Sequence, residues 1–423
     1  MLIPAYVREN FDQVVKALEK RHLEAKPQLE HLLELDEVRR ATQAELDQTL
    51  SSANNIAKEI GQLFKQGAID EANQKKEISA ALKTTTKTLQ ESLQQTASEL
   101  QKVLFSLPNI PHESVPKGNS EEDNQLVSEH GKIPTLENDA LPHWELAKKY
   151  NLIDFELGVK ITGAGFPVYT GKGAKLQRAL INYFLDFNTA AGYAEVQVPH
   201  MVNEASGIGT GQLPDKEGQM YRVAEDDLYL IPTAEVPVTN MYRDSLLQEE
   251  ELPIQLTAYT PCFRREAGSY GAHVRGLNRL HQFDKVELVR IEQTENSYAA
   301  LDEMVAHVGK LLESLELPYR ILRLCGGDLG FTSALTFDFE VYSTAQNRWL
   351  EVSSVSNFEN FQANRLKLRY KTKNGKKQLA HTLNGSSLAL PRIVAGLLEN
   401  HQTSEGIRIP KALVPYTGFE LIN

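Results

Sequence analysis

The sequence contains very little cysteine and no long apolar run. Its 423 residues include two cysteines, Cys262 and Cys325, and no cysteine or histidine spacing typical of zinc binding. Neither a disulfide framework nor a structural zinc is therefore expected. The apolar stretch 388–398 is interrupted by Pro391 and Arg392, and it is well short of the roughly 20 residues that a transmembrane helix needs. We expect no membrane-spanning segment.

The N-terminus lacks the cationic start and apolar stretch of a secretory signal, since Arg8, Glu9 and Asp12 follow soon after Met1. Together with the scarcity of cysteine, this predicts a cytoplasmic protein. The net charge of −11 argues, taken alone, against a polyanionic partner. Any binding of nucleic acid would therefore depend on a local basic patch.

Residues 1–106 are predicted to form an antiparallel helical hairpin. Apolar residues recur at spacings of three and four in two runs, separated by a turn at 66–70 with Asp70 starting the second helix. A helix of about 39 residues is roughly 58 Å long, so the hairpin is expected to project from the rest of the chain. The seam is thin, with Arg39, Thr42 and Thr49 in or near it. Its predicted members are Leu32, Leu35, Leu46, Ala53, Ile56, Ile60 and Leu63, then Ile78, Leu82, Thr85, Leu89, Thr96 and Val103.

The distal half of this hairpin is mildly basic. Residues 58–90 contain six lysines and four acids, whereas residues 28–50 contain two arginines and six acids. This pattern is compatible with an ordinary solvated helical face and with contacts to nucleic-acid phosphates. The lysines concerned are Lys58, Lys65, Lys75, Lys76, Lys83 and Lys87.

A linker at 107–116, with three prolines, ends the hairpin and separates it from a second domain at 117–423. In that domain β-rich stretches alternate irregularly with helical runs, without βαβ repeats or a glycine-rich phosphate loop. We therefore predict an α+β fold with an antiparallel sheet flanked by helices. Predicted strands include 194–198, 227–231, 285–290 and 337–343, and predicted helices include 174–187 and 294–315.

Three polar segments could carry chemistry. The first is a long hairpin at 261–287, in which alternation would place Arg264 and Glu266 on one face, and Phe283, Lys285 and Glu287 on one face of the partner strand. Such a face could hold a nucleotide or form a ladder of ion pairs on a solvated sheet.

The second and third segments are 349–354 and 382–392. Glu351 and Ser354 offer the hard oxygen atoms that Mg²⁺ prefers, although Glu351 could equally be an ordinary strand carboxylate. Arg392 lies on an apolar helix, where it must either form a structural ion pair or contact a ligand.

These segments resemble a known family. Phe263-Arg264-Arg265-Glu266 resembles motif 2 of class II aminoacyl-tRNA synthetases, 192–199 with Pro199 resembles motif 1, and 385–392 with the following helix resembles motif 3. Four further strings narrow the resemblance to bacterial-type seryl-tRNA synthetases, and it extends over the whole chain. They are GTGQLP at 209–214, TAE at 233–235, HQFDKVE at 281–287 and HTLNGS at 381–386.

The resemblance implies a site for ATP and Mg²⁺, with Arg264 and Arg392 as catalytic residues. Arg264 would contact the α-phosphate, Arg279 the other phosphates and Glu266 the adenine, while Phe283 and Arg392 would stack on either side of the ring. Glu351 and Ser354 would bind the metal. The implied ATP-binding set is Arg264, Glu266, Arg279, Leu280, Phe283, Glu351, Val352, Ser353, Ser354 and Arg392.

The resemblance also implies the substrates and partners. Serine would be activated to seryl-adenylate and transferred to the 3′ end of serine tRNA, and of selenocysteine tRNA as well. The hairpin would grip the long variable arm of the tRNA, and motif 1 would form a homodimer interface. The implied serine-binding set is Thr233, Ala234, Glu235, Arg264, Glu287, Asn384 and Ser386.

Two positions depart from the family pattern: Leu335 replaces a common lysine and Asn364 a common arginine. Three rival functions are also considered. A synthetase-like enzyme that loads a carrier protein would lack the long hairpin. A catalytically dead paralogue should have lost its charged site residues, and a coiled-coil scaffold would not need the second domain.

Overall fold

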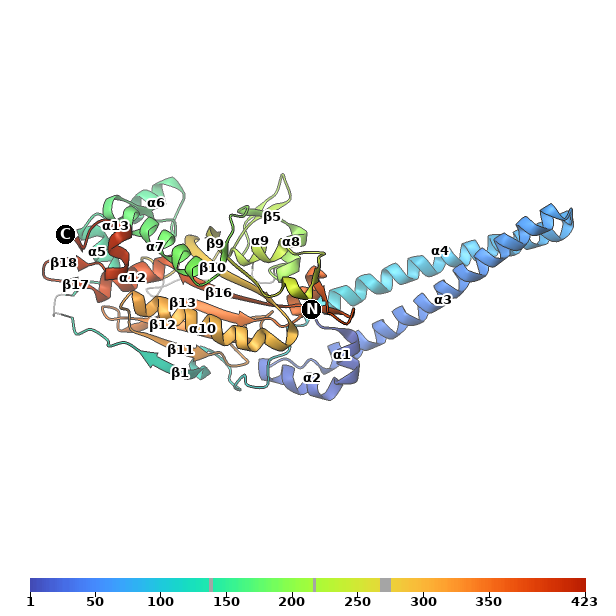
Figure 1. Ribbon diagram of the computed structural model, residues 1–423, viewed down its shortest axis with the longest axis horizontal. Helices are drawn as coiled ribbons and strands as arrows, with labels where there is room; N and C mark the ends of the chain where they lie inside the picture. Colours follow the sequence, from blue (N-terminus) through green and yellow to red (C-terminus); the bar gives the residue numbers. More distant parts are fainter. Residues whose placement is uncertain (137–139, 216–217, 267–274) are drawn as a thin grey trace. The chain divides into compact units, whose positions relative to one another are not determined.

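The computed structural model describes residues 1–136, 140–215, 218–266 and 275–423. These residues form two compact units, coloured along the sequence in Figure 1. The first comprises Met1–Glu19 and Leu23–Pro108, and the second Lys20–His22 and Asn109–Asn423. No helix in the described ranges combines the length and apolarity needed to cross a membrane.

Two long helices, α3 (Lys26–Lys65) and α4 (Ile69–Ser106), dominate the first unit and pack along each other as an antiparallel pair. Gly67 in the connecting turn has φ +75°, a left-handed conformation that glycine adopts without a steric penalty. The predicted hairpin is therefore present. Its second helix begins at Ile69, and Asp70 lies in the first turn, where a carboxylate interacts favourably with the helix dipole. Two short helices precede the pair: α1 (Pro4–Glu9) and α2 (Phe11–Leu18).

The residues predicted for the seam between α3 and α4 are correct for the first helix and partly wrong for the second. Ile78 is 49% exposed and Thr85 is also exposed, whereas Ser79 and Thr86 are half-buried. The inward positions of α4 keep a strict spacing of three and four, which passes through these small polar residues and not through Ile78. The helical period, and not the apolar character of a single side chain, therefore determines which residues of α4 face α3.

An eight-stranded sheet forms the centre of the second unit (Figure 1). All its strand pairs are antiparallel except β4 with β9. In spatial order its strands are β1 (Gln125–His130), β11 (Tyr319–Arg323), β12 (Leu335–Ser343), β13 (Arg348–Asn357), β16 (His381–Ala389), β10 (Gln282–Glu292), β9 (Ile254–Phe263) and β4 (Ala194–Glu195).

One face of this sheet is covered by three amphipathic helices, α7 (Gly171–Ala190), α10 (Ser297–Ser314) and α12 (Leu390–Asn400). Val286 and Leu288 of β10 join this core. Because side chains alternate along a strand, Lys285 and Glu287 lie on the opposite face, and their ion pair is consistent with that placement.

The opposite face of β10 is covered by α9 (Glu235–Asn240), whose Val238 packs with Val289, while α8 (Glu204–Thr210) and α11 (Phe361–Leu366) pack beside it. Smaller elements complete the unit: α5 (His143–Lys149), α6 (Phe155–Ile161), α13 (Val414–Thr417), β2 (Ile153–Asp154), β3 (Val168–Tyr169), β5 (Met201–Asn203), β6 (Arg222–Val223), β7 (Leu228–Leu230), β8 (Leu246–Gln248), β14 (Arg369–Lys371), β15 (Lys377–Leu379), β17 (Gln402–Thr403), β18 (Gly406–Arg408) and β19 (Leu421–Ile422).

The expected strand alternation at Arg264 and Glu266 is wrong. Strand β9 ends at Phe263, and Glu266 has φ +47°, which is incompatible with a strand. Arg264 N–H still donates to His281 O, but Arg265 N–H donates to Gln219 O, so the chain has left its partner strand. The loop that follows, 267–274, lies outside the described residues. Similarly, the strand expected at 194–198 is limited to Ala194–Glu195.

Candidate active site

The two predicted site regions lie along neighbouring strands of the large sheet. In the β10–β16 pair, Glu287 is opposite Ser386 and Val289 is opposite Asn384. Strands β9 and β10 pair without a bulge, and this places Phe283 opposite Cys262, just before Arg264. Residues from β9, β10, β13 and β16 are thereby brought to one region of the sheet.

The predicted nucleotide residues contact one another in pairs. The Arg264 guanidinium lies over the Phe283 ring at 5.3 Å from its centroid, and its Nε donates to Pro232 O. Arg279 forms an ion pair with Glu266. Arg392 donates from NH1 to Glu351 O at 2.6 Å, which connects α12 to β13. The region carries three guanidinium groups and one half-buried aromatic ring, a combination suited to phosphates and a planar ring.

The predicted serine residues form a second cluster in which two carboxylates are buried. Glu287 accepts from Lys285 Nζ at 2.7 Å and from Thr233 Oγ1 at 3.3 Å. Thr233 Oγ1 in turn accepts from the Glu235 backbone N–H at 3.2 Å, at the start of α9. Ser386 takes part through its carbonyl oxygen, which accepts from Ser353 Oγ at 2.6 Å. The cluster offers several acceptors within a small volume.

The pKa of Glu235 is strongly perturbed. Burial, and then the charge of Glu287, raise its pKa to about 7, although Gln362, Lys285 and Arg264 all act to lower it. Glu235 is thus partly protonated near neutral pH in the absence of a cationic partner. A small ligand that carries a positive charge would restore its ionised form.

The chemistry around Glu351 fits a hard divalent cation. Ser354 Oγ donates to Asp338 Oδ1, so the lone pairs of this hydroxyl remain available. Burial and the nearby charge of Glu351 raise the pKa of Asp338 well above its ordinary value. Glu351 also lies 3.6 Å from the Arg392 guanidinium. Its carboxylate, that of Asp338 and the Ser354 hydroxyl are hard oxygen donors of the kind that Mg²⁺ prefers. The described residues contain no group of three or more His, Cys, Asp or Glu side chains arranged to hold a metal ion.

Comparison with known proteins decides the family. Residues 220–401 match the tRNA synthetase class II core domain (G, H, P, S and T), and residues 1–111 match the seryl-tRNA synthetase N-terminal domain. The chain is 50% identical to the serine–tRNA ligase of Salinibacter ruber over 98% of both chains. The chain belongs to the seryl-tRNA synthetase family. The resemblance read from the motif strings is therefore confirmed.

Solved seryl-tRNA synthetases have the same fold. The enzyme from Pyrococcus horikoshii, in a complex with ATP, superposes with a TM-score of 0.91 at 33% identity, covering 100% of this chain and 99% of that one. The cytoplasmic serine–tRNA ligase of Naegleria fowleri, in complex with AMP, gives a TM-score of 0.84 at 27% identity and covers 97% and 95%. The predicted α+β class II fold is confirmed.

Some residues of the predicted synthetase site face the core. The side chains of Leu280 and Val352 belong to the main core, and Ala234, the N-cap residue of α9, packs in a smaller buried cluster with Val238 and Val289. Any contact that these three make with a substrate must therefore come from their backbone groups. Asn384 lies within β16, opposite Ser356 of β13. At the departure from the family pattern, Leu335 is also a core residue and is only 5% exposed.

Sequence reasoning gave no site role to the half-buried Asp338 or to the buried Gln362 and Thr382, although Thr382 begins the polar segment 382–392. Asp338 is opposite Ser354 in the β12–β13 register, and Gln362 bonds to Glu235. None of the three is adjacent in sequence to the site residue that it contacts. A signal did exist for Asp338, because an acid on a predicted strand otherwise rich in apolar residues needs a partner.

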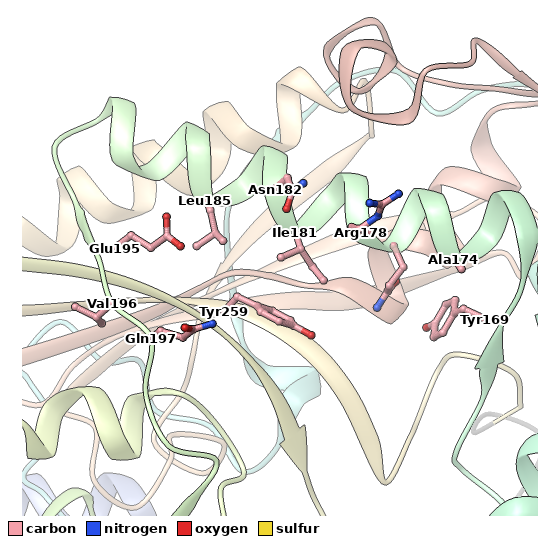
Figure 2. A pocket seen from close by; sticks show the side chains of 11 residues that line it. Tyr169, Ala174, Arg178, Ile181, Asn182, Leu185, Glu195, Val196, Gln197 and Tyr259 are labelled. Carbon is pink, nitrogen blue, oxygen red and sulfur yellow. The ribbon is translucent and has the colours of Figure 1, made fainter.

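The cavity in Figure 2 lies away from this cluster, between α7 and the chain from β4 to Gln197. It has a volume of about 490 Å³, and the figure shows Ile181 and Leu185 on one side and Val196 and Tyr259 on the other. Tyr259 donates to Asp284 on the helix-covered face of β10, opposite Glu287. This cavity therefore belongs to the motif 1 region and not to the substrate face.

The lysines predicted for the arm are mostly exposed. Lys75 is half-buried and forms an ion pair with Glu59, Lys76 lies over the Phe64 ring at 4.5 Å, and Lys87 is 3.9 Å from Glu91. The remaining three are exposed: Lys58, Lys65 and Lys83. Their role in binding tRNA stays a prediction.

The perturbed pKa of Glu235 predicts a pH-dependent gain in stability for Glu235→Gln. A carboxyl whose pKa rises from 4.5 to about 7 on folding destabilises the folded state by about 3 kcal/mol once ionised. This cost is absent below pH 4.5, grows between pH 4.5 and 7, and is complete above pH 7. In urea denaturation the variant should therefore gain stability over wild type at pH 8 but not at pH 4.5. An equal difference at both values would contradict the assignment.

Proposed function

We propose that the chain activates L-serine with ATP, forming seryl-adenylate and pyrophosphate, and then transfers serine to the 3′ end of serine tRNA and of selenocysteine tRNA in the cytoplasm. The observation that carries this proposal is the pairing of two buried carboxylates, Glu235 and Glu287, beside Arg264 and Phe283. The acceptors suit a small cationic substrate with a hydroxyl, and the neighbouring guanidinium and ring suit a nucleotide.

In the activation step, the serine carboxylate attacks the α-phosphate of ATP and pyrophosphate leaves. The nucleophile is already ionised, so no general base is required, and catalysis depends on positioning and on stabilising charge. Arg264 is assigned to the phosphate where negative charge accumulates, and Arg279 and Arg392 to the remaining phosphates and the adenine. Fixed cations of this kind require little reorganisation during the reaction.

Glu351 and Ser354 would hold Mg²⁺, which when bound neutralises phosphate charge and orients the leaving pyrophosphate. Asp338 would support this site by accepting a hydrogen bond from the Ser354 hydroxyl. Removing a carboxylate that orients a metal ligand in this way typically lowers metal affinity by about 10-fold to 100-fold.

Asp338→Asn is therefore expected to raise the Mg²⁺ concentration needed for half-maximal activation roughly tenfold or more. A Mg²⁺ titration of pyrophosphate exchange measures this, with Asp244→Asn as the matched control. Asp244 is an exposed carboxylate 3.7 Å from Lys367, far along the chain from the metal residues. An unchanged Mg²⁺ requirement in Asp338→Asn would remove Asp338 from the site.

Selectivity for serine is proposed to depend on its hydroxyl. Thr233, Glu235, Glu287 and Ser386 provide buried acceptors, and alanine would leave some of them unpaired. Sites that hydrogen-bond a substrate hydroxyl reject the analogue without it far more strongly than hydrophobic pockets reject a missing methyl group. Threonine must be excluded by the limited space.

The hairpin of α3 and α4 is proposed to bind the long variable arm of tRNA, and the motif 1 region to form a homodimer. The family match over residues 1–111 supports the first assignment. For the second, the cavity between α7 and β4 is lined by residues of the motif 1 string, including Glu195 and Gln197. A second copy of the chain would cover it.

Serine-dependent exchange of pyrophosphate into ATP, without tRNA, tests the proposed activation directly. We expect exchange with serine and none with alanine or threonine at equal concentration. If folded protein with Mg²⁺ shows no exchange with any amino acid, the result would instead favour a catalytically inactive paralogue.

A further inference from the structure

The amide of Gln362 lies directly behind Glu235. Gln362 Nε2 donates to Glu235 Oε1 at 2.6 Å and to Thr210 O at 3.1 Å. Gln362 Oε1 accepts from Thr382 Oγ1 at 2.7 Å. Gln362 on α11 thus connects α9, α8 and β16, and both hydrogens of its amide are used.

The direction of this hydrogen-bond chain is fixed by chemistry. Thr210 contributes a carbonyl, which can only accept, and an ionised Glu235 can also only accept, so the amide nitrogen must face both. The Thr382 hydroxyl then donates a hydrogen bond to the amide oxygen. Gln362 and Thr382 are each 1% exposed, so water cannot replace a lost partner without entering the core.

The arrangement leaves one side of Glu235 for a ligand. Among the described residues, its Oε2 receives no hydrogen bond, while Oε1 is held by Gln362. Glu287, by contrast, is already paired with Lys285. The neutral amide behind Glu235 fixes the orientation of the carboxylate and leaves its negative charge in place. A lysine or arginine at the same position would neutralise that charge.

We propose that Gln362, held by Thr382, is a positioning residue that orients the carboxylate of Glu235 for the serine substrate. This inference rests on the proposed function. It assigns to α11 a part in serine binding that does not depend on direct contact with the substrate.

The effect of Gln362 on the pKa of Glu235 makes its positioning role measurable in a pH profile. The Gln362 hydrogen bond lowers the pKa of Glu235, as do Lys285 and Arg264, while burial and Glu287 raise it. Loss of the Gln362 donor should therefore raise that pKa further. The acidic limb of the pH profile for serine activation should move to higher pH in consequence.

The test compares Gln362→Leu and Thr382→Val with wild type in serine-dependent pyrophosphate exchange. Gln402→Leu is the matched control, because Gln402 is a half-buried glutamine that bonds to Leu141 and Glu399 outside the site. Gln362→Leu should raise the KM for serine by about tenfold to a hundredfold, as expected for losing a hydrogen bond to a charged group. The KM for ATP should change little.

Thr382→Val should show a smaller rise in the same KM, because the amide loses its orientation but not its donor, and Thr382→Ser should restore the wild-type value. Gln362→Glu should fail most at high pH, where two carboxylates would face each other. Equal KM values for serine in wild type and Gln362→Leu, or a pH profile that does not move, would overturn the proposal. Inactive wild-type protein would instead contradict the proposed function itself.

Discussion

Replacing Arg264 with alanine is expected to lower the kcat of serine-dependent pyrophosphate exchange by on the order of 10² to 10³. Arg264 is half-buried, with its guanidinium held over the Phe283 ring and against the carbonyl of Pro232. A cation fixed in this way stabilises charge that develops on the phosphate during attack, and solvent cannot substitute for it without reorganising. Steady-state exchange over a range of ATP and serine concentrations measures the effect.

Two further variants distinguish charge from geometry at Arg264. Arg264→Lys keeps the charge but loses the planar fork, so it should recover only part of the activity. Arg408→Ala removes an exposed arginine 3.5 Å from Glu316 and should leave exchange unchanged. A kcat for Arg264→Ala within threefold of wild type would exclude Arg264 from the catalytic step.

Shortening the hairpin is expected to abolish most tRNA charging while leaving serine activation intact. Deleting 52–65 and 69–82 removes two heptads from each helix, keeps the turn at Gln66–Ala68 and preserves the register of the seam. Four candidate lysines are lost, and the salt dependence of tRNA binding should weaken by about three to four units in the log–log slope. Charging at low tRNA concentration should fall by on the order of 10²-fold or more, since reach is lost as well as charge.

A second variant separates these two causes. Substituting the same lysines, Lys58, Lys65, Lys75 and Lys76, by glutamine keeps the helices at full length. If phosphate contacts dominate, this variant and the shortened hairpin should have similar salt slopes. Full charging by the shortened protein would contradict the assignment of the hairpin to tRNA, and loss of pyrophosphate exchange would show that the deletion had disturbed the second unit.

Local sequence rules predicted the helical hairpin well because its signal is repeated many times. Each heptad of α3 gives the same inward position, so a single polar residue such as Thr49 does not mislead. The same reasoning failed at Ile78, where one apolar side chain was given more weight than the spacing of its neighbours. In a thin seam the backbone period is the stronger constraint, because few apolar contacts oppose it.

The residues proposed to bind the nucleotide were named from the sequence, but their arrangement could not be predicted from it. Strand alternation correctly placed Lys285 and Glu287 together, since β10 continues without interruption through both. It failed at Glu266, where the chain leaves β9 and a left-handed residue redirects it. Side-chain alternation holds only while a partner strand supplies hydrogen bonds. The pairing of β9 ends where the chain turns to the segment around Gln219, whose carbonyl accepts from the Arg265 N–H.

The sequence by itself determined the family, the α+β fold, the hairpin and the identities of the charged residues proposed to contact substrates, because these depend on local spacing and on strings of adjacent residues. Only the tertiary structure decided that Gln362 bonds to Glu235, that Asp338 accepts from Ser354 and that Leu280 and Val352 face the core. Those relations join residues from separate elements. They arise when packing encloses a polar group among residues that are distant in sequence, and no local pattern in the chain specifies which partners it will have.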